Sequence, residues 1–196
     1  MLANRLRPGD KIAIVSPSNP VTENLLDQFN KGLRFLEDLG FAVIKGKHLF
    51  SDSLGYSARP EEKAEDINSL FSDNSVKGII CAQGGSNANS CLQELDWNTI
   101  RNNPKVFIGL SDITVILNTI FTKTGLITFH GSDIIWGFGR EPSQYDKSEF
   151  VDRLMQGKIE KVTAIDDSQT VRKGKSEGKL LGGNLRGFLK LAGTPF

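Results

Sequence analysis

Short apolar runs alternate with amphipathic stretches along most of the chain. In residues 23–39 the leucine and phenylalanine side chains recur at helical spacing, and Gly40 is placed to end a helix. Strands that alternate with helices are typical of a parallel sheet with helices on both faces. We therefore predict an α/β domain with a flavodoxin-like parallel sheet. Its strands are expected at residues 11–15, 41–44, 76–82 and 106–110, and its helices at residues 23–39, 60–71, 89–95 and 111–123.

The pattern loosens after Gly139. The residues that follow are polar and include the charged stretch at residues 172–177, which is typical of a domain connection. The last segment, residues 182–192, predicts a helix whose apolar face is either exposed or covered by a partner. The predicted organisation is an α/β domain over residues 1–140, a connecting segment over residues 141–177 and the beginning of a second domain over residues 178–196.

The composition narrows the class of protein. The 196 residues are 38% hydrophobic and 24% charged, with a formal net charge of +1, which indicates no bias towards nucleic acid or a membrane surface. We find no apolar run long enough to span a bilayer and no leader pattern after Met1, so we expect a cytoplasmic protein. Cys81 and Cys91 lack the spacing of metal ligands and are predicted to be small core residues.

Ser111 stands where a nucleophilic serine would be presented. The strand predicted at residues 106–110 runs into this serine and then directly into a helical pattern, and Gly109 allows close passage of the backbone. The sequence Gly-x-Ser-x-Gly is incomplete, because Ile113 fills its last place. A plainer interpretation is also open, in which Ser111 caps the helix and Asp112 suits its positive end.

A glycine-rich turn follows the strand predicted at residues 76–82. Gly84 and Gly85 let the backbone turn its amide groups outward at the carboxyl end of that strand. Acyl transfer needs such N–H donors to stabilise an oxyanion, and the amides of Gly85 and Asp112 are the candidate pair. A simple turn or a phosphate cradle would use the same glycines. The residues predicted at the ligand-binding edge of the sheet are Ser16, Gly84, Gly85 and Ser111.

Five segments in a fixed order resemble the LD-carboxypeptidase family of serine peptidases. They are residues 6–18, 84–89 together with 95–97, 107–114, 124–131 and 178–185. Five motifs in the family's order are more specific than any one of them. Within the family, the Gly-Gly-Ser-Asn-Ala-Asn and Leu-Asp-Trp sequences resemble the microcin C immunity branch more closely than the branch that acts on murein peptides.

The resemblance implies a serine carboxypeptidase that hydrolyses a C-terminal amide bond through an acyl-enzyme. Ser111 matches the family's nucleophile, and the amides of Gly85 and Asp112 match its oxyanion hole. The implied substrates are murein peptides or peptidyl-nucleotides, with roles in peptidoglycan recycling or microcin immunity. The loop residues expected to contact the substrate are Gly84, Ser86 and Asn87. We expect a homodimer, and no cofactor, metal ion, nucleic acid or membrane partner.

The family's Ser-Glu-His triad takes its glutamate and histidine from a C-terminal domain that begins at a Gly-Gly-Asn-Leu motif. This chain ends at Phe196, shortly after that motif, so it resembles a truncated member and is expected to be inactive alone. Its two histidines, His48 and His130, are interpreted as a surface and a structural residue. The alternative function is a catalytically silent module that binds a peptide or nucleotide. Trp97 could stack on a nucleobase, but we favour a packing role.

Overall fold

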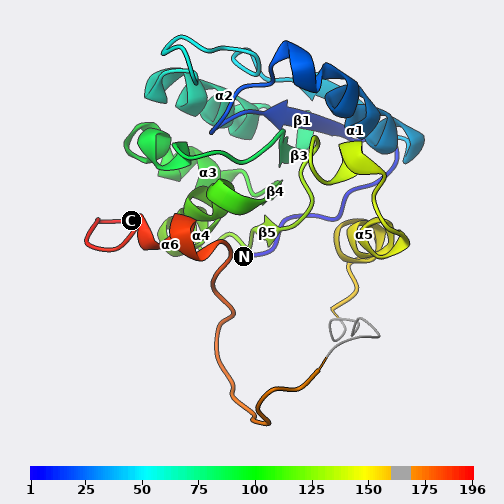
Figure 1. Ribbon diagram of the computed structural model, residues 1–196, viewed down its shortest axis with the longest axis vertical. Helices are drawn as coiled ribbons and strands as arrows, with labels where there is room; N and C mark the ends of the chain where they lie inside the picture. The colour runs from blue at the N-terminus through cyan, green and yellow to red at the C-terminus, as the bar shows by residue number, and fades with distance from the viewer. Residues whose placement is uncertain (160–168) are drawn as a thin grey trace.

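The computed structural model describes residues 1–159 and 169–196. Its centre is a five-stranded sheet in which all neighbouring strands are parallel, with the order β2-β1-β3-β4-β5 (Figure 1). The predicted α/β fold with a parallel sheet is therefore confirmed. The strands are β1 (Lys11–Val15), β2 (Ala42–Lys45), β3 (Val76–Cys81), β4 (Val106–Gly109) and β5 (Phe129–His130).

Helices cover both faces of the sheet, as predicted. Figure 1 shows α1 (Leu26–Asp38) on one side, and α2 (Pro60–Ser72), α3 (Trp97–Asn102) and α4 (Thr114–Thr124) on the other. Gly125 ends α4 in the left-handed conformation, with a φ of +75°. Three 3₁₀ turns precede α1, α3 and α4 along the chain, namely η1 (Glu23–Leu25), η2 (Ala88–Glu94) and η3 (Ser111–Ile113).

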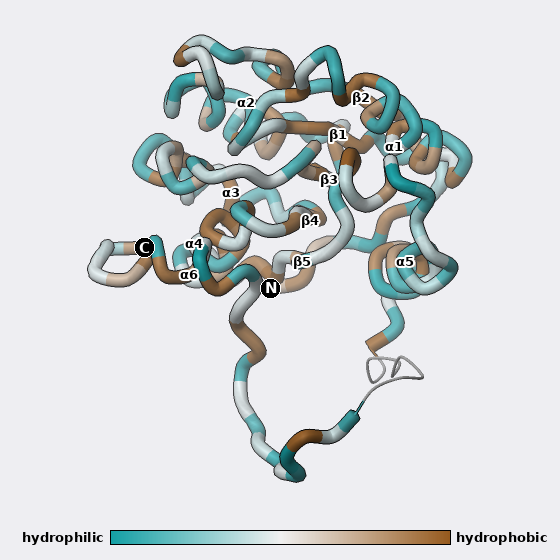
Figure 2. The backbone as a smooth tube through the Cα atoms, in the orientation of Figure 1, coloured by the Kyte–Doolittle hydropathy of each residue, from teal (hydrophilic) through white to brown (hydrophobic). Residues whose placement is uncertain are grey.

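The hydrophobic core lies between the sheet and these helices. Figure 2 shows apolar positions along the central strands, where β1 and β3 are covered on both faces. The largest buried side chains of the strands include Ile12, Ile14, Ile79, Ile80 and Phe107. Cys81 and Cys91 are free and buried, which confirms their predicted place in the core.

The predicted connecting segment begins with further helical structure. α5 (Gln144–Phe150) starts at Ser143, whose hydroxyl oxygen accepts a hydrogen bond from an amide of the first turn, and a π-helical turn (Val151–Met155) continues it. Phe150 and Leu154 are buried in the core, so the α/β body extends beyond residue 140. Sequence analysis missed α5 because the helix is short and few apolar side chains anchor it among many charged ones.

The C-terminal segment contains α6 (Leu185–Leu189), a helix shorter than the predicted one over residues 182–192. Figure 1 shows residues 169–178 lying away from the α/β body before the chain returns at α6. Leu180, Leu185 and Leu189 are 98%, 71% and 60% exposed, so the exposure expected for this apolar segment is observed. Among the residues that the structure describes, no helix has both the length and the apolar character to cross a membrane.

Candidate active site

Ser111 occupies a strained turn between β4 and α4. Its φ is +59°, in the left-handed region that residues with a side chain rarely adopt. The N-cap of η3 is Leu110, which has extended backbone with φ −130° and ψ 157°, so the interpretation of Ser111 as a helix cap is wrong. Within the described residues, we find no hydrogen bond to the Ser111 hydroxyl. Such strained positions cluster at functional sites, where surrounding structure holds them in place.

Two glycines leave room for this turn. A Cβ atom on Gly109 would lie 2.6 Å from Cγ2 and 2.9 Å from Cβ of Ile113. A Cβ atom on Gly84 would lie 3.0 Å from Cβ of Ser111 and 3.3 Å from the amide nitrogen of Asp112. The turn after β4 and the glycine loop after β3 are therefore in contact, as their places at the ends of neighbouring strands predict.

Substitution of Gly109 by alanine is expected to destabilise the protein. The added methyl group would overlap Ile113 near its rigid Cβ atom, so we expect the melting temperature to fall by about 5 °C. The matched control is Gly174→Ala, because nothing lies within 4 Å of a Cβ atom at that position. Thermal unfolding of both variants, followed by circular dichroism, tests the prediction, which an unchanged midpoint for Gly109→Ala would contradict.

The two candidate oxyanion donors lie on the two contacting segments. Gly85 is exposed and has a φ of +155°, and its amide donates no hydrogen bond to any other residue that the structure describes. Asp112 is in the first turn of η3, where backbone N–H groups have no partner within the helix. Both amides are thus available to an anionic oxygen, and fixed donors of this kind stabilise the oxyanion formed in acyl transfer.

The carboxylate of Asp112 is buried and fully engaged. Oδ2 accepts hydrogen bonds from Ser18 Oγ at 2.7 Å and the Ala88 amide at 2.8 Å, and Oδ1 accepts one from Lys190 Nζ at 2.5 Å. Burial alone would raise the pKa of Asp112, but the hydrogen bonds from Lys190, Ala88 and Ser18 outweigh it and lower the pKa. Asp112 is therefore ionised at neutral pH and anchors the turn that carries Ser111.

The predicted substrate loop is tied to the same anchor. The Asn87 amide donates to Ser18 Oγ at 3.4 Å, and Asn87 Oδ1 accepts a hydrogen bond from Lys63 Nζ at 2.8 Å. Lys63 is buried, and this burial lowers the pKa of its amine. The Ser86 carbonyl oxygen accepts a hydrogen bond from Lys190 Nζ. Gly84, Ser86 and Asn87 thus belong to one connected loop beside Ser111, and their contact with a substrate stays a prediction.

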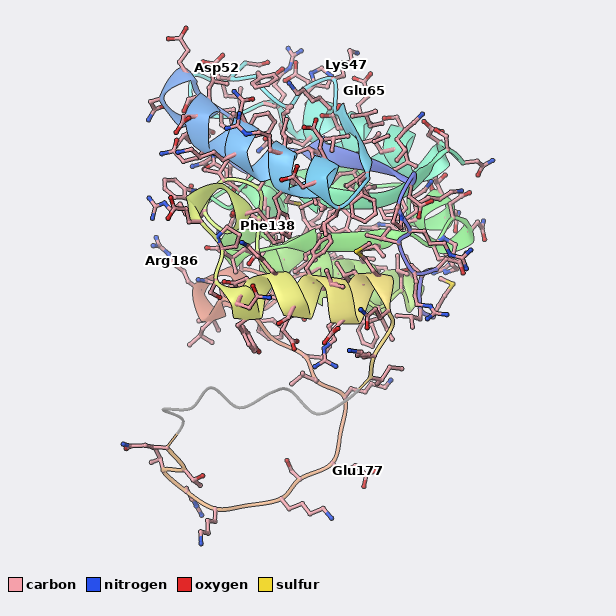
Figure 3. All side chains as sticks on the ribbon, turned by 90° about the vertical axis from the view of Figure 1, so that its right-hand side faces the viewer. Lys47, Asp52, Glu65, Phe138, Glu177 and Arg186 are labelled. Carbon is pink, nitrogen blue, oxygen red and sulfur yellow. The ribbon has the colours of Figure 1, made fainter. Side chains whose placement is uncertain are left out.

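The two histidines are placed differently with respect to Ser111. His130 ends β5 beside Gly109, and partial burial of its ring lowers the pKa. Among the described residues, no carboxylate orients this ring. His48 Nε2 lies 2.9 Å from Glu65 Oε2, after the edge strand β2. Figure 3 shows Glu65 at the top of the molecule, apart from Arg186 of α6. Neither histidine therefore forms a triad with Ser111 in this structure.

The two tryptophans also differ in their surroundings. Trp97 packs against Phe196 with ring centroids 6.3 Å apart, which agrees with the packing role that we favoured. Trp136 Nε1 donates to Gln83 Oε1 at 3.0 Å, and the Arg140 guanidinium lies 4.1 Å from the centre of its ring. This indole is 40% exposed and is held next to the glycine loop, a position that sequence reasoning missed.

The family model for the LD-carboxypeptidase N-terminal domain matches residues 12–131 of this chain. That range is more than half of the 196 residues and includes Ser111, Asp112 and the glycine loop. The chain therefore belongs to the LD-carboxypeptidase family of serine-type carboxypeptidases, as its motifs predicted.

Individual relatives agree with this assignment. The Bacillus subtilis protein named probable murein peptide carboxypeptidase is 32% identical over 97% of this chain. The microcin C7 self-immunity protein MccF of Escherichia coli is 38% identical over 74% of this chain. A solved ligand-free structure of MccF matches with a TM-score of 0.85 and 31% identity over 98% of this chain. The chain spans 59%, 42% and 66% of the lengths of these three chains, respectively.

Proposed function

We propose that this protein is a serine carboxypeptidase in which Ser111 is the nucleophile. The observation that carries the proposal is the φ of +59° at Ser111. A capping serine needs no such conformation, since N-cap residues lie in the extended region of the backbone. A strained turn from strand to helix that exposes the hydroxyl is the device by which α/β hydrolases present their serine.

The proposed reaction passes through an acyl-enzyme. Ser111 Oγ attacks the carbonyl carbon of the C-terminal amide bond while its proton passes to a general base. The oxygen of that carbonyl becomes an oxyanion and accepts hydrogen bonds from the amides of Gly85 and Asp112. The carbon–nitrogen bond then breaks, and the leaving amine takes the proton. Water attacks the resulting ester and releases the acid and free Ser111.

The general base is proposed to come from outside residues 1–196. His48 pairs with Glu65, and His130 lacks an orienting carboxylate among the described residues. A glutamate and a histidine of a further domain, as the family resemblance implies, would complete the triad. Residues 1–196 alone are therefore proposed to be inactive, because a serine without a base is a poor nucleophile.

The proposed substrate is a peptide whose terminal carboxyl group is joined to a nucleotide-like group. Two relatives are named for microcin C7 immunity and for murein peptides. Solved structures of MccF hold aspartyl sulfamoyl adenosine and glutamyl sulfamoyl guanosine. The Gly-Gly-Ser-Asn-Ala-Asn and Leu-Asp-Trp sequences, which resemble the microcin C immunity branch more closely than the murein branch, favour the peptidyl-nucleotide class.

Hydrolysis of two substrates tests this proposal. We expect the protein as its own cell makes it to release aspartate from an aspartyl phosphoramidate of AMP faster than it releases D-alanine from a murein tetrapeptide, with mass spectrometry as the readout. Faster cleavage of the tetrapeptide would reverse the substrate assignment and leave the peptidase proposal intact. Hydrolysis of neither substrate would contradict the peptidase proposal.

A second candidate is a module that binds a peptide or nucleotide without catalysis. The observation in its favour is that neither His48 nor His130 is oriented towards Ser111 by a carboxylate in the described part of the chain. This candidate requires binding of AMP without turnover by the protein as its cell makes it, which calorimetry combined with product analysis would detect.

A cytoplasmic location and a homodimer stay predictions.

A further inference from the structure

Lys190 connects the two segments that carry the candidate oxyanion donors. Its Nζ atom donates hydrogen bonds to Asp112 Oδ1 at 2.5 Å and to the Ser86 carbonyl oxygen at 2.7 Å. Asp112 carries one of the candidate amide donors, and Ser86 directly follows Gly85, which carries the other. A single ammonium group, next to the C-terminus of α6, therefore bonds to both segments at once.

The geometry of these bonds is more specific than that of a surface ion pair. The side chain of Asp112 is 3% exposed and that of Lys190 is 25% exposed, so solvent screens the pair only weakly. Neutralisation of Asp112 alone would not require the bond to Ser86. Lys63, a buried amine near this carboxylate, donates to Asn87 and Ser90 instead. Lys190 is thus the cation that links the Ser111 turn to the glycine loop.

We propose that Lys190 is a positioning residue that holds the Gly85 and Asp112 amides at the separation required by an oxyanion. The inference rests on the proposed serine peptidase function and deepens it. An oxyanion hole is effective because its donors are fixed before the reaction begins. Gly85 is exposed and its amide is unpaired among the described residues. The loop is held before it by the Asn19 amide, which donates to the Gly84 carbonyl oxygen, and after it by the bonds to Asn87. Lys190 adds a contact between these points, at Ser86, the residue next to Gly85.

The position of Lys190 also makes the oxyanion hole depend on α6. The N-terminal side of α6 is held to α4 by two hydrogen bonds, from the Asn184 amide to Thr114 Oγ1 at 2.9 Å and from Asn118 Nδ2 to the Gly182 carbonyl oxygen at 2.9 Å. Lys190 extends this attachment to the loop after β3. The hole is therefore complete only when α6 lies against α4.

Nuclear magnetic resonance of the 196-residue chain tests the positioning role of Lys190 without any hydrolysis. We expect Lys190→Met to shift the Gly85 and Asp112 amide resonances. We also expect it to accelerate exchange of the Ala88 amide, which donates to Asp112 Oδ2, about 10-fold, because loss of the Lys190 bond loosens the carboxylate that holds this amide. Lys190→Arg keeps the cation and should restore most of both effects. The control is Arg186→Met, since Arg186 is exposed on the same helix (Figure 3). Unchanged amides in Lys190→Met, or equal changes in Arg186→Met, would overturn the proposal.

Kinetics of the protein as its cell makes it separate positioning from substrate binding. We expect Lys190→Met to lower kcat about 10-fold and to leave KM within a factor of about two, because the hole acts on the transition state. A raised KM with unchanged kcat would overturn the proposal. If the protein hydrolyses neither substrate, the peptidase function fails, and the resonance experiment still decides whether Lys190 positions the amides.

A double-mutant cycle distinguishes loss of the specific Lys190–Asp112 contact from general destabilisation of the fold. Asp112→Asn keeps one side-chain oxygen that can accept hydrogen bonds from the Ser18 hydroxyl and the Ala88 amide, but it removes the negative charge that pairs with Lys190. If both residues act through one contact, the combined variant Lys190→Met/Asp112→Asn should lose no more kcat than the more damaging single variant. Additive losses of kcat in the combined variant would overturn the proposed role of Lys190.

Discussion

Replacement of Ser111 by alanine is expected to abolish hydrolysis by the protein as its own cell makes it, with a loss of about a million-fold in turnover. No other hydroxyl in the described structure occupies the turn after β4. Without attack by Ser111, the substrate carbonyl does not become the oxyanion that the candidate donors on Gly85 and Asp112 would stabilise. Release of aspartate from the phosphoramidate substrate, followed with time, measures the loss.

The matched control for this prediction is Ser72→Ala. Ser72 is exposed at the end of α2 and is not part of the loops that surround Ser111. Ser72→Ala should hydrolyse the substrate at the wild-type rate, and both variants should melt near the wild-type temperature. A Ser111→Ala variant that is folded and retains a tenth of the activity would contradict the assignment of the nucleophile.

Replacement of Asp112 by alanine is expected to lower the free energy of unfolding by about 3–5 kcal/mol. The substitution leaves the Lys190 ammonium without its charge partner and removes the acceptor for the Ala88 amide and the Ser18 hydroxyl. A loss of this size corresponds to a fall of about 10 °C in melting temperature for a protein of this length. Thermal and denaturant-induced unfolding of the 196-residue chain measure it.

The dependence of this effect on pH is a second readout. The pKa of Asp112 in the folded protein lies below its ordinary value of 3.8, because the hydrogen bonds that it accepts outweigh the cost of burial. Its contribution to stability is therefore complete above that value and is lost as the pH falls through the folded pKa. The difference in the free energy of unfolding between wild type and Asp112→Asn should therefore become smaller as the pH falls through this pKa. A difference that is independent of pH would contradict the role of the charge.

The α/β sheet could be predicted because its strands and main helices each carry a complete local pattern. The first helix shows this, since its apolar residues repeat at helical spacing and Gly40 follows it. α5 has no such pattern, because it is a short helix whose stability depends on burial of Phe150 against residues far away in the sequence. The predicted C-terminal helix was too long, because only Leu185–Leu189 are helical.

The candidate site could be predicted only in part for a similar reason. The motifs marked Ser111 and the glycine loop because glycine and serine have distinctive roles at the ends of strands. They gave no sign of the network around Asp112, which joins Ser18, Ala88 and Lys190 from three separate segments. Lys190 lies 78 residues from Asp112 along the chain, and no local pattern reports a contact of that range.

Covalent labelling tests whether Ser111 is the nucleophile of a serine peptidase. The protein as its own cell makes it would be treated with a fluorophosphonate, digested and analysed by mass spectrometry. We expect one modified peptide, the one that contains Ser111, and no modification in Ser111→Ala. A protein that hydrolyses its substrate while Ser111 stays unlabelled, or a label on another serine, would contradict it.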